Sequence, residues 1–126
     1  MIWLLIAIVG VLGGIMEATK DTITFRFESS KFALLNPKFW NPNVSWQNKY
    51  VSGSKIKKWL FKTILVWVTD AWHLVKVVET LSVFIGFTLC HIYAESNWYF
   101  IIYVLFLYLV KKSTFETFLH YFNINS

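Results

Sequence analysis

Residues 59–94 read WLFKTILVWVTDAWHLVKVVETLSVFIGFTLCHIYA, an apolar stretch that is interrupted by the ionisable side chains Lys62, Asp70, His73, Lys76 and Glu79. A straight helix over the whole stretch would be about 54 Å long, whereas the hydrocarbon core of a bilayer is roughly 30 Å thick. The stretch therefore cannot be one straight membrane span. How it divides decides the fold.

Two divisions of this stretch fit a membrane. In the first, residues 59–79 and 80–94 are separate spans, but no polar turn lies between them. In the second, residues 57–68 lie at the membrane interface and one bent helix crosses the bilayer over 70–94. Thr69 and Asp70 support this start, because their side chains can accept hydrogen bonds from the free N–H groups of a first helical turn. We expect the second division, which leaves both basic segments of the chain in the cytoplasm.

Two further apolar runs complete the predicted membrane domain. Residues 2–18 carry no charge before Glu17 and come close to the ~20 residues that a span needs. A retained helix is favoured over a cleaved signal peptide, because no Lys or Arg precedes the run and no small-residue cleavage site follows it. Residues 97–112 have aromatic side chains at both ends and finish in Lys111-Lys112, the pattern of a span with a basic stop. The sequence thus predicts three spans, over about 2–18, 70–94 and 97–112.

The composition predicts an all-α integral membrane protein. Hydrophobic residues make up 56% of the 126 residues, which is more apolar surface than a water-soluble fold of this size can bury. Eight of the twelve Lys and Arg residues lie in the loop 19–58, between the first span and the next apolar stretch. This clustering is typical of a cytoplasmic loop, and it accounts for the basic charge without a nucleic-acid partner. We expect one domain, residues 1–126, in a bacterial inner membrane, with the N-terminus outside and the C-terminus in the cytoplasm.

The loop 19–58 has two distinctive parts. Apolar and polar side chains alternate over residues 23–28, which predicts a short extended segment, with a continued helix as the alternative. Farther on, the Asn-Pro steps at 36–37 and 41–42 prevent one continuous helix. Disordered linkers are poor in aromatic residues, whereas this segment is rich in them. We expect rings buried at lipid headgroups or between helices, and the predicted interface residues are Phe39, Trp40, Trp46 and Tyr50.

The last residues, 113–126, predict a short helix at the membrane interface. Their apolar side chains recur at helical spacing, while Glu116 and His120 lie elsewhere on the helix. An apolar face beside polar residues is typical of a helix that lies in the plane of the headgroups. The apolar residues are Phe115, Phe118, Leu119 and Phe122.

Asp70 and His73 are the candidate catalytic residues, because an ionisable group inside an apolar stretch costs roughly 2.5 to 3.5 kcal/mol on insertion and needs a partner or a function. At i and i+3 they share a helix face, where the carboxylate can orient the imidazole. Glu17 and Asp21, at i and i+4 near the end of the first span, could add two carboxylates. Together, the four residues are candidate ligands for a divalent metal ion.

A structural interpretation of the same residues carries more weight, because an Asp-x-x-His pair is a motif of low specificity. Asp70 then caps a helix, and the side chains of His73 and Lys76 reach the headgroups. Structural ion pairs are expected between Asp70 and Lys62 or between Lys76 and Glu79. Motifs that would indicate a hydrolase, a phosphate-binding loop or a dinucleotide site are absent from the sequence.

Three segments of the sequence resemble a group of small membrane proteins of Bacteroidota and their phages. The resemblance covers about the middle half of the chain and carries no assigned activity. It implies that the aromatic loop and the Asp70-His73 pair belong to one arrangement. The segments are Phe39-Trp40-Asn41-Pro42, Ser45-Trp46-Gln47-Asn48-Lys49-Tyr50 and Thr69-Asp70-Ala71-Trp72-His73-Leu74.

Three functions remain compatible with the sequence. The first is a non-enzymatic subunit or self-assembling component, with membrane lipid and a homo-oligomer or larger membrane complex as partners. The second is a membrane-embedded enzyme that depends on a divalent metal, or a protein that handles ions or protons, using Asp70 and His73. The third is a pore of the phage holin type. Whether the protein is an enzyme is left open by its residues.

Overall fold

The computed structural model describes residues 1–50 and 52–124, and every regular element in these two ranges is a helix. Three helices dominate the fold: α1 (Ile2–Phe25), α5 (Ala71–Tyr93) and α6 (Asn97–Phe122). Each is long and apolar enough to cross a membrane. The predicted number of spans, and the helical class of the protein, are confirmed at this level.

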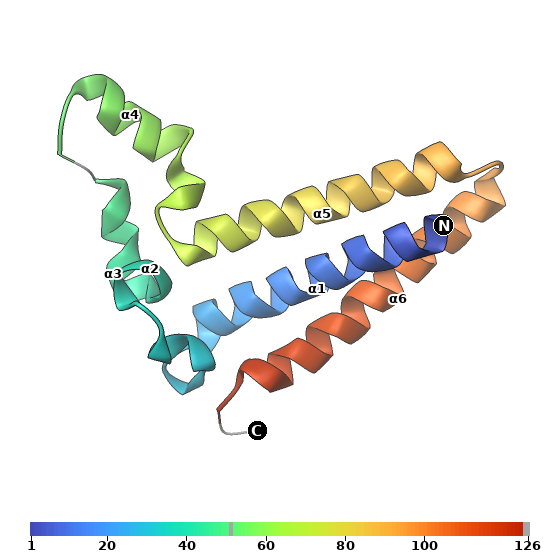
Figure 1. Ribbon diagram of the computed structural model, residues 1–126, viewed down its shortest axis with the longest axis horizontal. Coiled ribbons are helices and arrows are strands. Elements are labelled where there is room, and N and C mark those ends of the chain that lie inside the picture. Colours follow the sequence, from blue (N-terminus) through green and yellow to red (C-terminus); the bar gives the residue numbers. More distant parts are fainter. Residues whose placement is uncertain (51, 125–126) are drawn as a thin grey trace.

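Helix α1 lies between α5 and α6 and packs along both (Figure 1). The N-terminus lies beside the turn 94–96 that joins α5 to α6, and we call this the turn end of the bundle. The connection from α1 to α5 and the last residues of α6 lie at the opposite end, the loop end (Figure 1). Near the turn end all three helices share one buried cluster, made of Ile6, Cys90, Tyr103 and Leu107.

The helices α5 and α6 contact each other much less than either contacts α1. A largely apolar cleft of about 360 Å³ lies between them, over α1. Its floor includes Gly10 and Gly13 of α1, and its walls include Phe87 of α5 and Tyr108 of α6. The bundle is therefore closed near the turn and more open toward the loop.

Short helices fold the loop end. Each Asn-Pro step starts one of them, because Asn36 and Asn41 accept hydrogen bonds at 3.0 and 2.9 Å from the N–H groups two residues on, while the following proline occupies the first helical position. The prediction that these steps interrupt the helix is confirmed. In chain order the elements are η1 (Phe27–Ser29), η2 (Lys31–Leu34), α2 (Pro37–Trp40), α3 (Pro42–Ser45), η3 (Trp46–Lys49), α4 (Lys55–Thr63) and η4 (Val66–Val68).

The C-terminal residues close this end of the fold. Phe32 packs against Phe122 at the end of α6, with ring centroids 4.8 Å apart. Beside this contact Ser30 and Asn123 form an isolated antiparallel bridge, and the N–H of Ile124 donates to the carbonyl of Ser29 at 2.9 Å. The last turn of α6 is thereby fixed to the segment that follows α1.

Two predicted boundaries differ from the structure. Helix α1 runs on to Phe25, so the predicted extended segment is wrong and the alternative of a continued helix is correct for residues 19–25. Buried contacts of Thr22 and Ile23 support these added turns. Residues 113–122 form no separate helix but continue α6, because no Gly or Pro interrupts them. Residue 51 of the predicted loop and residues 125 and 126 of the predicted C-terminal helix lie outside the described residues.

The stretch that decides the fold divides in the second of the two expected ways. Helix α5 is continuous from Ala71 to Tyr93, so separate spans over 59–79 and 80–94 are ruled out. Residues 55–68 form the separate elements α4 and η4. Asp70 is the N-cap of α5, which confirms the predicted helix start.

Two neighbouring glycines of α1 differ in how closely other helices approach them. A Cβ atom on Gly14 would lie 2.5 Å from the carbonyl oxygen of Lys111 and 2.7 Å from Cβ of Thr114. The backbone of α6 therefore occupies the space of a side chain at Gly14. At Gly13 the nearest atom would be Cε of Lys111, at an ordinary contact distance of 3.4 Å.

We predict that Gly14→Ala lowers the free energy of unfolding by about 1–3 kcal/mol, because α1 and α6 must move apart. Gly13→Ala is the matched control and should be neutral or stabilising, since alanine favours a helix by about 1 kcal/mol over glycine. Unfolding in mixed detergent micelles, followed by circular dichroism, measures both variants. Equal stability of the two variants would contradict the packing described for Gly14.

Candidate functional site

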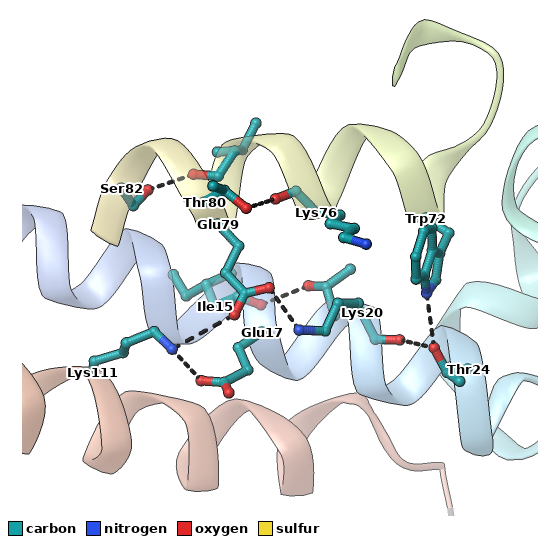
Figure 2. Close-up of polar contacts among 12 residues, drawn as sticks. Ile15, Glu17, Lys20, Thr24, Trp72, Lys76, Glu79, Thr80, Ser82 and Lys111 are labelled. Carbon is teal, nitrogen blue, oxygen red and sulfur yellow. Dashed lines mark hydrogen bonds and ion pairs between the residues drawn. The ribbon is translucent and has the colours of Figure 1, made fainter. Parts of the chain in front are cut away.

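Four charged side chains from the three long helices meet near the loop end and form what we call the ionic network: Glu17, Lys20, Glu79 and Lys111 (Figure 2). The amine of Lys20 lies 2.6 Å from Oε2 of Glu79. The amine of Lys111 lies 2.5 Å from Oε2 of Glu17 and 3.6 Å from Oε1 of Glu79. Two carboxylates and two amines thus balance in charge and connect α1, α5 and α6.

Three members of the ionic network, Glu17, Glu79 and Lys111, lie at nearly the same depth. At 1.5 Å per residue, Glu17 lies about 22 Å from the start of α1, and Glu79 and Lys111 lie about 21 Å from the ends of α5 and α6 at the turn. This level is inside the part of the helices that a hydrocarbon core of roughly 30 Å would surround. Charges are expensive there, and direct pairing lowers their cost.

Sequence reasoning missed this network. It predicted an ion pair between Lys76 and Glu79 on one helix, which is wrong: Glu79 turns to α1 and α6, and the amine of Lys76 lies 4.8 Å from the ring centroid of Trp72. It also treated Lys111 only as a basic stop. The signal that could have found the network is the equal spacing of Glu17, Glu79 and Lys111 from the turn end.

Asp70 has the structural role that was predicted for it. Its carboxylate is buried at 2% exposure and accepts a hydrogen bond at 2.9 Å from the N–H of His73, which caps α5. Both carboxylate oxygens also lie 2.8–2.9 Å from Nδ1 of His73. The predicted ion pair of Asp70 with Lys62 is therefore wrong, because His73 takes that place. The pair can orient the imidazole, the role that a carboxylate has beside a catalytic histidine.

The four candidate metal ligands do not come together. Asp70 and His73 are in contact, but Glu17 pairs with Lys111 in the ionic network. Among the described residues, no three His, Cys, Asp or Glu side chains are grouped so as to hold a metal ion. The reason is the length of α1: the start of α5 lies beside Thr24, and Glu17 lies about 10 Å deeper along the helix. Asp21 likewise lies within α1 rather than at its end.

The connection between Thr24 and the start of α5 is a direct one. The indole N–H of Trp72 donates to the hydroxyl of Thr24 at 3.0 Å (Figure 2). The side-chain amide of Asn48 bridges the loop to the same place, donating to the carbonyls of Thr69 at 2.8 Å and of Lys38 at 2.5 Å. The aromatic loop is thus attached to the residues that begin α5.

A cavity of about 320 Å³ lies where the loop meets α5. Residues of the loop and the Asp70-His73 pair both line it. Both the loop and the start of α5 contribute polar and aromatic side chains to its wall. The lining residues are Thr24, Pro42, Asn43, Ser45, Trp46, Asp70, Trp72 and His73.

The four predicted interface residues separate into two pairs. Phe39 and Trp40 are half-buried, and the ring of Trp40 stacks on that of Phe32 with centroids 5.0 Å apart. They hold the loop against the helices. Trp46 and Tyr50 face outward at 48% and 55% exposure, in an edge-to-face pair 5.8 Å apart. Of the four, these two present free aromatic surface.

Comparisons with protein-family models, curated proteins and solved structures give no match for this chain. The geometry itself defines two candidate sites. The first is the ionic network, which connects the three long helices. The second is the cavity of about 320 Å³, which is lined by residues of the loop and by Asp70 and His73.

We predict that Glu79→Gln lowers the free energy of unfolding by about 2 kcal/mol, because two amines lose a charged partner in apolar surroundings. Glu116→Gln is the control, since Glu116 is exposed on α6 and forms no ion pair among the described residues. In the double variant that carries Glu79→Gln and Lys20→Gln, the free energy of unfolding should fall by less than the sum of the decreases in the two single variants. Additive losses in this double-mutant cycle would contradict the pairing of Lys20 with Glu79.

The capping role of Asp70 predicts a difference between two substitutions. Asp70→Ala should cost about 1 kcal/mol, because the first turn of α5 loses its side-chain acceptor. Asp70→Asn should retain most of the stability, since asparagine also caps helices well. Amide hydrogen exchange over residues 71–74 measures the change directly. Equally fast exchange in both variants would show that the carboxylate charge, not the cap, matters at this position.

Proposed function

We propose that this protein is a non-enzymatic component of a membrane, which assembles with a second copy of itself or with another membrane protein through the aromatic pair Trp46 and Tyr50 at the loop end. The observation that carries the proposal is that this pair is exposed although the loop beneath it is folded and held by specific contacts. A rigid aromatic surface of this kind loses little conformational entropy when it binds.

The composition of the pair also favours protein contact. Trp and Tyr are enriched among the residues that dominate binding energy in protein interfaces. The ring of Tyr50 has the amine of Lys62 4.8 Å and that of Lys49 5.4 Å from its centroid. These cations border the pair as a polar rim borders the centre of an interface.

The ionisable residues support a structural role over catalysis. The carboxylate of Asp70 caps α5 and contacts His73, and Glu17 and Glu79 balance the amines of the ionic network. Each of these carboxylates already has a partner that stabilises the fold. The metal-dependent alternative loses its support, because the candidate ligands are not grouped.

The proposed orientation has the loop end in the cytoplasm and the turn end outside. All twelve Lys and Arg residues lie in segments on the loop side of the ionic network or within it, whereas the turn 94–96 carries Glu95 and no cation. Retention of basic residues on the cytoplasmic side is the general rule for helical membrane proteins. A bacterial inner membrane is the compartment that we propose with this orientation.

The test is the assembly state in mild detergent. Trp46→Ala combined with Tyr50→Ala should shift the protein from a larger species to the single chain on native gels and in light scattering. Thermal unfolding should change little, since both rings are about half-exposed. Trp98→Ala is the matched control, because Trp98 is 77% exposed at the turn end. The assembly state of this variant should equal that of the unaltered protein.

Mass analysis of the purified larger species separates a homo-oligomer from a complex with another protein. An unchanged larger species in the double variant would contradict the interface. A single chain in the unaltered protein, together with lysis of the host on expression, would favour a holin-like pore instead.

A further inference from the structure

Helix α4 is amphipathic and has lysines along the edge of its apolar face and opposite it. Ile56, Trp59 and Leu60 recur at i, i+3 and i+4 and so share one face. On the same nine-residue helix Lys55 and Lys62 lie along one edge of this face, whereas Lys58 lies on the far side, which it shares with Phe61. The helix is capped by a side chain, as the hydroxyl of Ser54 accepts from the N–H of Lys57 at 3.3 Å.

The apolar face of α4 is uncovered in the folded chain. Ile56 is 72% exposed and Trp59 57% exposed, and no residue of α4 is buried. The contacts of α4 are chiefly with its neighbours in the chain, η3 and η4. Figure 1 shows α4 beyond the start of α5, set at an angle to the three long helices.

The surroundings of α4 are strongly positive. Residues 29–69 contain seven lysines and no Asp or Glu. No ion pair among the described residues involves Lys55, Lys57, Lys58 or Lys62. The positive charge of this region is therefore left for an external negative partner.

The position of α4 in the chain keeps it beside the bilayer. Only residues 64–70 separate it from α5, a helix long and apolar enough to span. Ile64 and Trp67 in this short connection are 53% and 39% exposed, so they extend the apolar surface of α4 toward the start of the span.

We infer that α4 lies on the bilayer surface at the loop end and binds anionic phospholipid. Ile56, Trp59 and Leu60 enter the boundary between headgroups and acyl chains. The lysines face the phosphates and the added negative charge of the headgroups. Basic amphipathic helices with an aromatic residue on the apolar face bind membranes in this way, and their affinity rises with the anionic lipid content.

A lipid surface fits these observations better than a protein groove. The exposed apolar face is narrow and short, and positive charge is spread around it rather than confined to one contact. A bilayer offers a continuous apolar layer beneath a continuous negative layer. Lipid binding by α4 does not depend on assembly through Trp46 and Tyr50, and a separate experiment measures it.

The test uses the full chain in lipid nanodiscs. Cys90 is the single cysteine of the chain and is buried in α5, so Cys90→Ala provides a background for placing one probe at a time. Ile56→Cys places an environment-sensitive fluorophore on the apolar face, and Lys58→Cys places it on the charged side as the matched control. Discs of phosphatidylcholine are compared with discs that also contain phosphatidylglycerol, each with lipids that carry a quencher below the headgroup.

We expect quenching at position 56 to exceed that at position 58 several-fold in discs with phosphatidylglycerol, and the difference to shrink in high salt or in phosphatidylcholine alone. Replacing Lys55, Lys58 and Lys62 with Gln should remove the dependence on phosphatidylglycerol, whereas Lys31→Gln with Lys38→Gln should leave most of it. Equal quenching at positions 56 and 58 would overturn the inference, and so would quenching that is the same in discs with and without phosphatidylglycerol. So would a probe at position 56 that is shielded from lipid and aqueous quenchers alike, because a protein would then cover α4.

Discussion

The arrangement of the three long helices depends on charges that lie at one depth in apolar surroundings. Glu17, Glu79 and Lys111 come from different helices, and each would be costly if its helix stood alone. Their pairing selects the rotation and the relative height of the helices, because sliding one helix by a turn would separate the partners by about 5 Å. Apolar packing alone would not select one register so sharply, since lipid is as apolar as the helix faces.

Close packing of backbones makes this pairing feasible. Gly14 lets α6 approach α1 within the space of a side chain, which brings Lys111 to the level of Glu17. The loop end then builds on α1 and the start of α5. Trp72 bonds to Thr24, and Asn48 bonds to the carbonyl of Thr69, so the start of α5 is fixed both to α1 and to the aromatic loop.

Local sequence signals predicted those features that depend on neighbouring residues. The cap at Asp70 and the interruptions at the Asn-Pro steps follow from a few adjacent side chains, and the number of spans follows from the length of each apolar run. The partners of Glu79 were not predictable in this way, because the choice of Lys20 and Lys111 over Lys76 is made by helix packing. The same holds for the difference between half-buried Trp40 and exposed Trp46: both lie in one aromatic segment, and only the folded loop distinguishes them.

The contact of Phe32 with Phe122 has a consequence for the order in which the protein is made. A chain is synthesised from its N-terminus, so Phe32 leaves the ribosome long before Phe122 exists. The loop end consequently stays unfinished while α5 and α6 are made, and its bridge from Ser30 to Asn123 forms only after the whole of α6 has been synthesised. A chain cut short within α6 would thus lack the two contacts that close the loop end, and the segment that follows α1 would lose its partner on α6.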